Sequence, residues 1–519
     1  MTSCSMVSLC SLRVASCGIA SPAAQKLNTG ISRLSFPKDF IFGTSSAAAQ
    51  YEGAAAEGGR KPSIWDHWCT LPDKIDDGSN PSITMDQYHR YKEDVRLLSD
   101  LGVNAYRFSI SWTRLFPDGR VNPEGLAYYN SLINSLLEHG IKPFITIYHW
   151  DLPQALQESM GGWTNKEIVD KYVEFADICF AAFGDRVKHW ITFNEPCHSL
   201  KYCYAEGIWP PGVKSDTEVY IAGHNTLLAH AAAVKRYREK YQAKQGGKIG
   251  ISLDGFWYEP VYQIPQDVAA SYRALDFNLG WFLSPVVYGY YPETMRANVG
   301  GRLPHFTEEE ARNLMGSIDF LGLNYYTSMY VKDSPSDIWQ PAGYNTDMRA
   351  KTLFDVDGIP IGPKAYETSW LSIVPWGFYK LLNYIKKEYN NPTIFVTENG
   401  FNQVHAPYKD SMDDNERIQY LTGHYTNMAQ AIRDGADVQG HFIWSFLDCW
   451  EWKSGYTNHF GLFYVDRNTQ DRLPKKSAYW VKNFLKPDRG LILPSATPPL
   501  VQPLGKNVAL APAQAVQAF

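Results

Sequence analysis

The feature of this chain that most constrains its fold is a repeated alternation of short strand-like runs with longer, amphipathic segments. Apolar side chains recur with helical spacing over residues 166–183 and 376–389, for example. Eight strand-like runs lie between such helices, at residues 40–43, 104–109, 142–148, 188–193, 248–254, 320–325, 393–396 and 440–445. This alternation predicts an α/β protein whose parallel strands close into a (β/α)8 TIM barrel with loop insertions.

The length of 519 residues by itself suggests about two to four domains. Because a barrel with insertions can occupy more than about 400 residues, we expect a single catalytic domain over residues 36–489. Residues 1–35 form a separate N-terminal extension. Residues 490–519 are rich in proline and alanine, and we expect a disordered tail there.

Two glutamates stand where strand-like runs end. Glu195 lies in the string TFNEP at residues 192–196, and Glu398 lies in the string TENG at residues 397–400. In a parallel barrel the carboxyl ends of the strands meet at one face, so the two side chains can share one pocket. Retaining glycoside hydrolysis requires two carboxyl groups about 5 Å apart, one to protonate the leaving oxygen and one to attack the sugar carbon.

Further strings accompany these two in a fixed order. They are FPKDFIFG at 36–43, YRFSISW at 106–112, YHWDLP at 148–153, GLNYY at 322–326 and WSFLD at 444–448. Together the strings resemble glycoside hydrolase family 1, the β-glucosidase family, from about residue 36 to residue 485, and the plant branch fits best. The resemblance implies a (β/α)8 barrel. Because it also guides the choice of the eight runs above, the agreement between those runs and the barrel is not independent evidence.

The resemblance implies a retaining β-glucosidase that hydrolyses O-linked β-D-glucosides by double displacement, through a covalent glucosyl-enzyme intermediate. Glu195 matches the family's acid/base and Glu398 its nucleophile. Thioglucosidases of the family carry glutamine in place of the acid/base, so Glu195 favours O-glycosides. Arg107 and Tyr326 match the residues that support the nucleophile; a structural ion pair is a second, compatible role for Arg107.

The family's sugar-binding residues also have counterparts in this chain. They are Gln50, His149, Asn194, Asn324, Trp444, Glu451 and Trp452. Trp370 matches the tryptophan beside the aglycone, the part of the substrate that leaves. Glu451 separates family members that bind neutral sugars from phospho-glycosidases, which carry a small residue there. We therefore expect glucose to be preferred and 6-phosphosugars to be rejected.

The chain departs from the family pattern at two places. Ala49 precedes Gln50 where an aromatic residue is usual, and Cys449 and Trp450 replace the usual Asn and Phe. We expect these changes to reshape the rim of the pocket. They put the fine substrate specificity in doubt, and not the reaction.

Composition and motifs exclude several other functions. The net charge of −5 argues against nucleic acid or an anionic membrane as a partner, and no run of 18 apolar residues indicates a membrane span. The chain has no His-Glu-x-x-His string, no clustered Cys-x-x-Cys and no phosphate-binding glycine loop. We therefore expect no metal and no organic cofactor. A small-molecule β-glucoside is the expected partner, and the oligomeric state stays open.

The N-terminal extension and the cysteines bear on localisation. Residues 1–35 hold eight serines and no acidic residue, and polar residues interrupt any apolar core of the kind that a secretory signal needs. A plastid transit peptide and an unstructured cytosolic extension both fit this composition. The usual loop cysteine pair of secreted plant members is missing, and we expect Cys197 and Cys203 to be free. The predicted location is plastid or cytosol.

Two rival functions remain open. A transglucosidase uses the same pair of glutamates but transfers the sugar to an acceptor alcohol instead of water. A catalytically idle, sugar-binding barrel belongs to a different class, and the presence of both carboxylates disfavours it.

Overall fold

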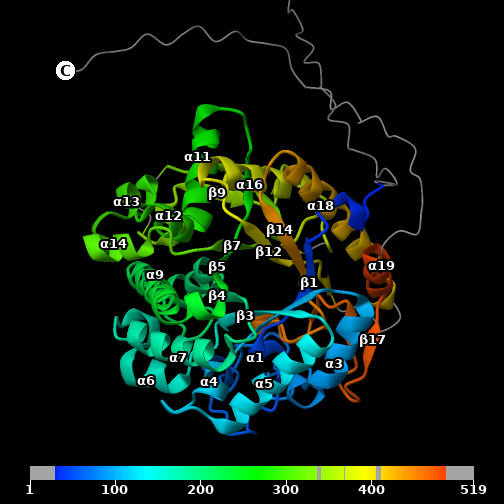
Figure 1. Ribbon diagram of the computed structural model, residues 1–519. Helices are drawn as coiled ribbons and strands as arrows, with labels where there is room; N and C mark the ends of the chain where they lie inside the picture. Colours follow the sequence, from blue (N-terminus) through cyan, green and yellow to red (C-terminus); the bar gives the residue numbers. More distant parts are fainter. Residues whose placement is uncertain (1–29, 336–340, 367–368, 405–410, 487–519) are drawn as a thin grey trace, which may run out of the picture. The chain divides into compact units, whose positions relative to one another are not determined.

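Eight parallel strands form a closed barrel in the computed structural model, which describes residues 30–335, 341–366, 369–404 and 411–486. Around the barrel the order is β1-β14-β12-β7-β5-β4-β3-β2 (Figure 1). The strands are β1 Ile41–Ser45, β2 Ala105–Ser109, β3 Lys142–Tyr148, β4 His189–Asn194, β5 Lys248–Asp254, β7 Phe320–Asn324, β12 Ile394–Asn399 and β14 Val438–Ile443. All eight predicted strands are confirmed. Residues 490–519 and most of the predicted extension lie outside the described residues.

The barrel interior is packed with side chains, so it is a core and not a pore. Seven buried residues from seven strands make a separate apolar cluster there: Ile41, Ala105, Phe144, Ile191, Phe320, Phe395 and Phe442. Strand β5 contributes no side chain to this cluster at Gly250, where an added Cβ would lie 2.1 Å from the carbonyl oxygen of Phe320. The near-continuous apolar runs in the sequence follow from this arrangement, because a parallel barrel strand is buried on both faces.

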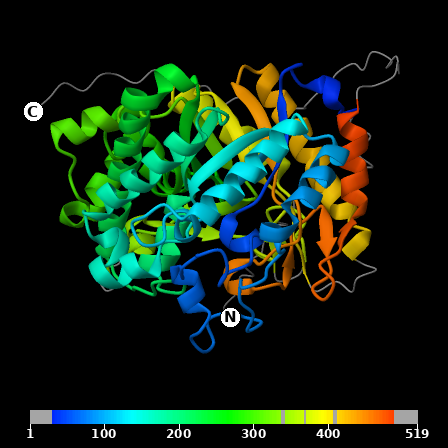
Figure 2. The same ribbon diagram turned by 60° about the horizontal axis from the view of Figure 1, so that its bottom comes forward.

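A ring of helices covers the barrel (Figures 1 and 2). Its long members are α3 Gln87–Leu101, α5 Pro123–Glu138, α7 Ile168–Phe183, α9 Glu218–Tyr237, α16 Pro375–Glu388, α18 Asn415–Arg433 and α19 Lys476–Leu485. The predicted helices over 166–183 and 376–389 correspond to α7 and α16, with ends that differ by one or two residues. Within the described part of the chain, no helix combines the length and apolar character needed to cross a membrane.

Insertions surround the carboxyl ends of the strands. After β5 and β7 the chain forms a small three-stranded sheet of β6 Trp257–Pro260, β8 Ser328–Asp333 and β9 Ala350–Leu353, on which α11 Pro265–Leu275 packs. After β14 it forms a loop that is followed by β16 Phe463–Val465 and β17 Arg472–Pro474. In Figure 2, β17 lies beside α19, and α19 lies beside α18. These insertions supply the walls of the site described next.

Candidate active site

The two glutamates lie at the carboxyl ends of β4 and β12. Glu195 directly follows β4, as predicted, whereas Glu398 is the second-last residue of β12 and not a residue after it. The strand extends because pairing with β7 and β14 continues through Glu398 and Asn399 after a shift in register. Such irregularities re-aim side chains at a strand end, and here the shift directs Glu398 towards its partners at the mouth of the barrel.

The backbone at Glu195 has a left-handed conformation with a φ of 43°. A non-glycine residue pays a conformational cost there. Its N–H donates a hydrogen bond of 2.8 Å to the carbonyl oxygen of Ser252 on β5, and the short helix α8 Pro196–Leu200 begins at the next residue. The strand before and the helix after therefore hold Glu195 in one orientation.

Each carboxylate oxygen of Glu398 has its own donor. Arg107 Nη1 lies 2.5 Å from Oε1, and the Tyr326 hydroxyl donates to Oε2 at 2.8 Å. Arg107 is fully buried and Glu398 is almost so. A buried carboxylate is stable as an anion when a cation and a hydrogen-bond donor accompany it. The structure thus brings together the three residues that the family resemblance grouped.

Two asparagines connect Glu398 to Glu195. Arg107 Nη2 donates to Asn194 Oδ1 at 2.6 Å, and Asn324 Nδ2 donates both to Asn194 Oδ1 at 3.0 Å and to Glu195 Oε1 at 2.8 Å. Asn194 Nδ2 lies 3.1 Å from His149 Nε2. His149 therefore accepts this hydrogen bond as a neutral imidazole, in keeping with a pKa that burial and Arg107 lower well below its usual value.

The surroundings shift the pKa values of the two carboxyl groups to different extents. Burial, the charge of Glu398 and the charge of Asp254 raise the pKa of Glu195 well above its ordinary value. Burial also raises the pKa of Glu398, but Arg107 and the Tyr326 hydroxyl oppose that effect. One proton shared between them consequently resides on Glu195, and Glu398 carries the negative charge.

A cavity of about 360 Å³ opens onto both glutamates. Most of the predicted site residues line it: Glu195, Glu398, His149, Asn324, Tyr326, Trp370, Trp444, Glu451 and Trp452. Arg107, Asn194 and Gln50 are not among its lining residues but contact residues that are. A pocket of this size with convergent polar groups and aromatic walls suits a small ligand.

The predicted sugar ligands Glu451 and Gln50 are held in different ways. Glu451 Oε1 accepts hydrogen bonds from Trp444 Nε1 at 3.3 Å and from the Cys449 thiol at 3.0 Å. Burial raises the pKa of Glu451 to about 8. Gln50 Nε2 donates to the Trp450 carbonyl oxygen at 2.9 Å, and its buried Oε1 accepts no hydrogen bond.

The family departures lie behind the cavity wall and not at its rim. Ala49, Cys449 and Trp450 are all buried, and none of them is among the lining residues. Cys449 contacts the predicted sugar ligand Glu451 directly, so its effect on the site passes through that carboxyl group. Cys197 and Cys203 are free, as predicted. In the described residues no group of three or more His, Cys, Asp or Glu side chains is arranged to hold a metal ion.

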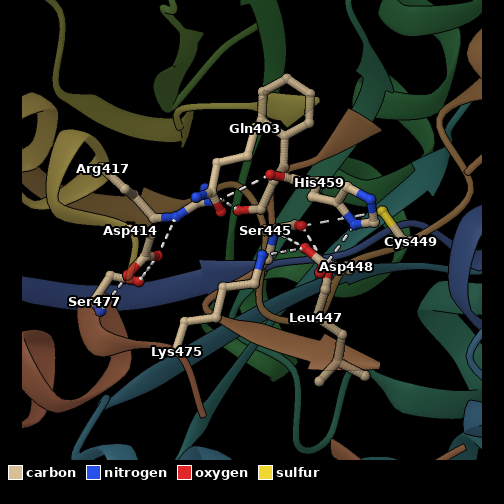
Figure 3. A network of polar contacts seen from close by, with 12 residues as sticks. Gln403, Asp414, Arg417, Ser445, Leu447, Asp448, Cys449, His459, Lys475 and Ser477 are labelled. Carbon is tan, nitrogen blue, oxygen red and sulfur yellow. Dashed lines mark hydrogen bonds and ion pairs between the residues drawn. The ribbon is translucent and has the colours of Figure 1, made fainter. Parts of the chain in front are cut away.

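The segment 444–452, which we call the sugar-side loop, is anchored through Asp448 (Figure 3). Lys475 Nζ and the Gly461 N–H each donate to Asp448 Oδ1 at 2.8 Å, and His459 Nδ1 lies 3.2 Å from Oδ2. Burial raises the pKa of the Asp448 carboxyl, but Lys475 and His459 outweigh it and hold that pKa well below its usual range. Asp448 lies in one of the family strings, but Lys475 could not be predicted as its partner, because no local pattern relates the two positions.

A second buried ion pair continues this network. Arg417 Nε donates to Asp414 Oδ2 at 2.7 Å, and the Ser477 N–H donates to Asp414 Oδ1 at 2.7 Å (Figure 3). Arg417 Nη1 also donates to the Phe460 carbonyl oxygen at 2.7 Å. Helices α18 and α19 are thereby tied to the segment that returns from the sugar-side loop.

The cavity is also lined by residues that no sequence motif singled out. They are His198, Tyr202, Trp209, Asp254, Phe256, Met329 and Phe354. Asp254 ends β5, and the others come from the insertions after β4, β5 and β7, where loop sequences follow no periodic pattern. With Trp370, which keeps 37% of its surface exposed, they form what we call the aglycone side.

Comparison with known proteins places this geometry in a family. Residues 32–489 match the model described as Glycosyl hydrolase family 1. The chain is 48% identical over 482 residues to Beta-glucosidase 34 of Oryza sativa subsp. japonica, which covers 89% of this chain and 94% of that protein. It is 49% identical over 466 residues to Beta-glucosidase 42 of Arabidopsis thaliana, covering 88% and 95% of the two chains.

A solved structure agrees with these relatives. A mutant rice β-glucosidase in a covalent complex with Glc matches with a TM-score of 0.87 at 45% identity, over 88% of this chain and 100% of that chain. The family match and the relatives extend over the whole barrel and both glutamates. This chain therefore belongs to glycosyl hydrolase family 1.

Proposed function

We propose that Glu398 is the nucleophile and Glu195 the acid/base of this enzyme, which is a retaining β-glucosidase. The observation that carries the assignment is the asymmetry between the two carboxyl groups. Arg107 and Tyr326 stabilise Glu398 as an anion, whereas Glu195 is buried beside that anion with one amide donor. The family's general mechanism and the β-glucosidase relatives support the same reaction.

In the first step a Glu398 oxygen forms a bond to the anomeric carbon of glucose. The glycosidic C–O bond breaks, and Glu195 gives its proton to the departing oxygen, so the aglycone leaves as a neutral alcohol. This step produces a glucosyl ester of Glu398. A mutant of the rice relative has been obtained in a covalent complex with Glc, which supports an intermediate of this kind.

In the second step a water molecule attacks the same carbon from the side that the aglycone left. Glu195, now a carboxylate, takes the water proton, and the ester bond to Glu398 breaks to release the carboxylate. Esterification removes the negative charge of Glu398, and with it one of the influences that raise the pKa of Glu195. Glu195 therefore changes from acid to base as the reaction needs it.

The sugar is held on the side opposite the aglycone wall. We assign the glucose hydroxyls to Gln50, His149, Asn194, Glu451 and Trp452, with Asn324 holding Glu195 and with Trp444 packed against the ring. The unpaired Gln50 Oε1 supports this assignment, because a buried acceptor without a partner costs about 1 to 3 kcal/mol until a ligand supplies a donor.

The decisive experiment is Glu398→Ala with added azide. We expect turnover of an aryl β-D-glucoside to fall below detection, and azide to restore activity with an α-glucosyl azide as product. The matched variant Glu195→Gln should give the β-azide on substrates with activated phenol leaving groups, because it retains the nucleophile. Retention of even a tenth of the wild-type activity by Glu398→Ala would refute the assignment.

A further inference from the structure

Polar side chains separate the apolar cluster inside the barrel from the two glutamates at its mouth. Arg107, Thr146 and Thr397 each follow a member of that cluster by two positions on the same strand. Because strand side chains alternate between the two faces, these three also face the barrel interior. Ser252 follows Gly250 by two positions on β5 and contacts Thr397. All four side chains are fully buried, and the proposed reaction gives no role to Thr397 or Ser252.

The Thr397 hydroxyl joins three strands of the barrel. It accepts a hydrogen bond from Ser252 Oγ of β5 at 3.0 Å and donates one to Asn324 Oδ1 of β7 at 2.6 Å. The Thr397 carbonyl oxygen accepts a hydrogen bond from Ser45 Oγ at 2.7 Å. Space for the Ser252 hydroxyl depends on Gly322, where an added Cβ would lie 2.2 Å from Ser252 Oγ. Both the backbone and the hydroxyl of Thr397 are therefore fixed.

The orientation of the Asn324 amide is set from both of its ends. Its nitrogen donates to Glu195 Oε1 and to Asn194 Oδ1, and the latter oxygen also accepts from Arg107. Its oxygen accepts from the Thr397 hydroxyl. A reversed amide would place its oxygen against two acceptors, which is unfavourable. The Thr397 hydroxyl thus supplies the one donor that this orientation of the amide needs.

These contacts link the two proposed catalytic residues. Thr397 directly precedes Glu398 in β12, and its hydroxyl reaches the Glu195 side chain through Asn324. The Ser252 carbonyl oxygen accepts the backbone N–H of Glu195 at 2.8 Å, so the same serine also holds the main chain of the acid/base. The strand that carries the proposed nucleophile therefore also sets the position of the proposed acid/base.

We propose that Thr397 is a positioning residue for the acid/base, because its hydroxyl holds the Asn324 amide with the NH2 group on Glu195. The inference rests on the proposed function, and Thr397 acts through Asn324 and not on the substrate. Removal of the hydroxyl leaves Asn324 Oδ1 buried without a donor, which is unfavourable. The amide then turns towards other partners, and its hydrogen bond to Glu195 weakens.

The test compares Thr397→Val with Thr397→Ser. Valine has nearly the shape of threonine but lacks the hydroxyl, whereas serine keeps it. For phenyl β-D-glucoside, whose leaving group needs a proton, we expect kcat/KM of the valine variant to fall about tenfold, because general acid catalysis is weakened. The serine variant should stay within about twofold of wild type, because it keeps the donor. For 2,4-dinitrophenyl β-D-glucoside, whose leaving group needs no proton, the valine variant should lose less than about twofold.

The pH dependence of kcat/KM distinguishes positioning from a general loss of structure. Burial is the main cause of the raised pKa of Glu195. The titratable and charged groups around Glu195 belong to several strands and the loops that follow them: Glu398, Asp254, Arg107 and Tyr326. The hydrogen bond from Asn324 lowers this pKa, because it stabilises the carboxylate. Its weakening in Thr397→Val raises the pKa, so the alkaline limb should move to higher pH by about half a unit.

Thr44 offers a matched control. It is an equally buried threonine, on β1, and its hydroxyl has no hydrogen-bond partner among the described residues. Thr44→Val should therefore leave both the ratio of the two substrates and the alkaline limb unchanged. A second control introduces Thr397→Val into an Asn324→Ala background, where it should have no further effect on the substrate ratio, because the residue through which it acts is gone.

The outcomes separate the two proposals. If wild-type enzyme does not hydrolyse phenyl β-D-glucoside, the proposed function fails. If it does, but Thr397→Val loses activity equally on both substrates with the alkaline limb in place, only the role of Thr397 fails. The substrate ratio does not depend on the amount of folded enzyme. Where the valine variant yields too little of it, Ser252→Ala removes the donor to Thr397 and should change both readouts in the same direction by less; an unchanged ratio would equally overturn the inference.

Discussion

The two sides of the cavity are built differently. On the sugar side, Trp444 and Trp452 are buried, and the loop that carries them is anchored through the ion pair of Asp448 and Lys475. On the aglycone side, Trp370 keeps 37% of its surface exposed. The aromatic residues of the sugar side are thus held inside the protein, whereas the aglycone side is partly open to solvent.

This difference matches what each side binds. The glucose part of the substrate is the same in every turnover, so fixed side chains lose little freedom when it binds. The leaving group varies among glucosides, and a partly exposed aromatic wall accommodates different rings. Variants on each side test whether the rigid side determines the choice of sugar and the open side the choice of leaving group.

The largest effect should come from Lys475→Met. The variant leaves the buried carboxylate of Asp448 without its cation, so we expect the free energy of unfolding to fall by about 3 to 5 kcal/mol. The neighbouring Lys476 pairs with Asp413 at 2.8 Å on the surface, and Lys476→Met should cost less than about 1 kcal/mol. Denaturant unfolding measures both, and equal costs would show that the sugar-side loop does not depend on the buried pair.

The next effect should be that of Glu451→Ala on glucose binding. Loss of a carboxyl group that accepts hydrogen bonds from sugar hydroxyls should lower kcat/KM by about 100-fold. The factor should be similar for every aryl glucoside, because the sugar is the same in all of them. Steady-state kinetics on phenyl and hydroxyphenyl glucosides measures this. A loss confined to one aglycone would mean that Glu451 contacts the leaving group and not the sugar.

A smaller effect connects the two sides through pH. Glu195 must be protonated for the first step, so activity is present below its pKa and falls as pH rises through it. The charge of Asp254 contributes to that raised pKa, so Asp254→Asn should move the alkaline limb of the kcat/KM profile to lower pH, by about half a unit to one unit. A limb that stays in place, or moves up, would mean that Asp254 does not influence the acid.

The smallest effect should be that of Trp370→Ala. The ring is partly exposed and contacts Tyr326 edge to face, with centroids 6.0 Å apart. We expect KM for aryl glucosides to rise by about three- to tenfold, as for loss of one aromatic contact, while the preference for glucose over galactose is unchanged. A changed sugar preference would show that the two sides are not independent.

The barrel, its eight strands and the family could all be predicted from the sequence. Strand and helix patterns depend on neighbours a few residues apart, and the family strings lie at strand ends. Every strand end lies at one face of a parallel barrel, which is why Glu195 and Glu398 were predicted to meet there although they are distant in sequence. Their catalytic roles, and those of the sugar ligands, stay predictions.

The pairing of the side chains could not be predicted in this way. The end of β12 beyond Glu398 depends on its register with two neighbouring strands. The contact of Cys449 with Glu451, the ion pair of Asp448 with Lys475 and the hydrogen bond of Asn278 with Asp254 depend on how separate insertions close over the barrel. No periodic pattern encodes these contacts, because a hydrogen bond is set by the positions of two atoms in space and not by the spacing of their residues along the chain.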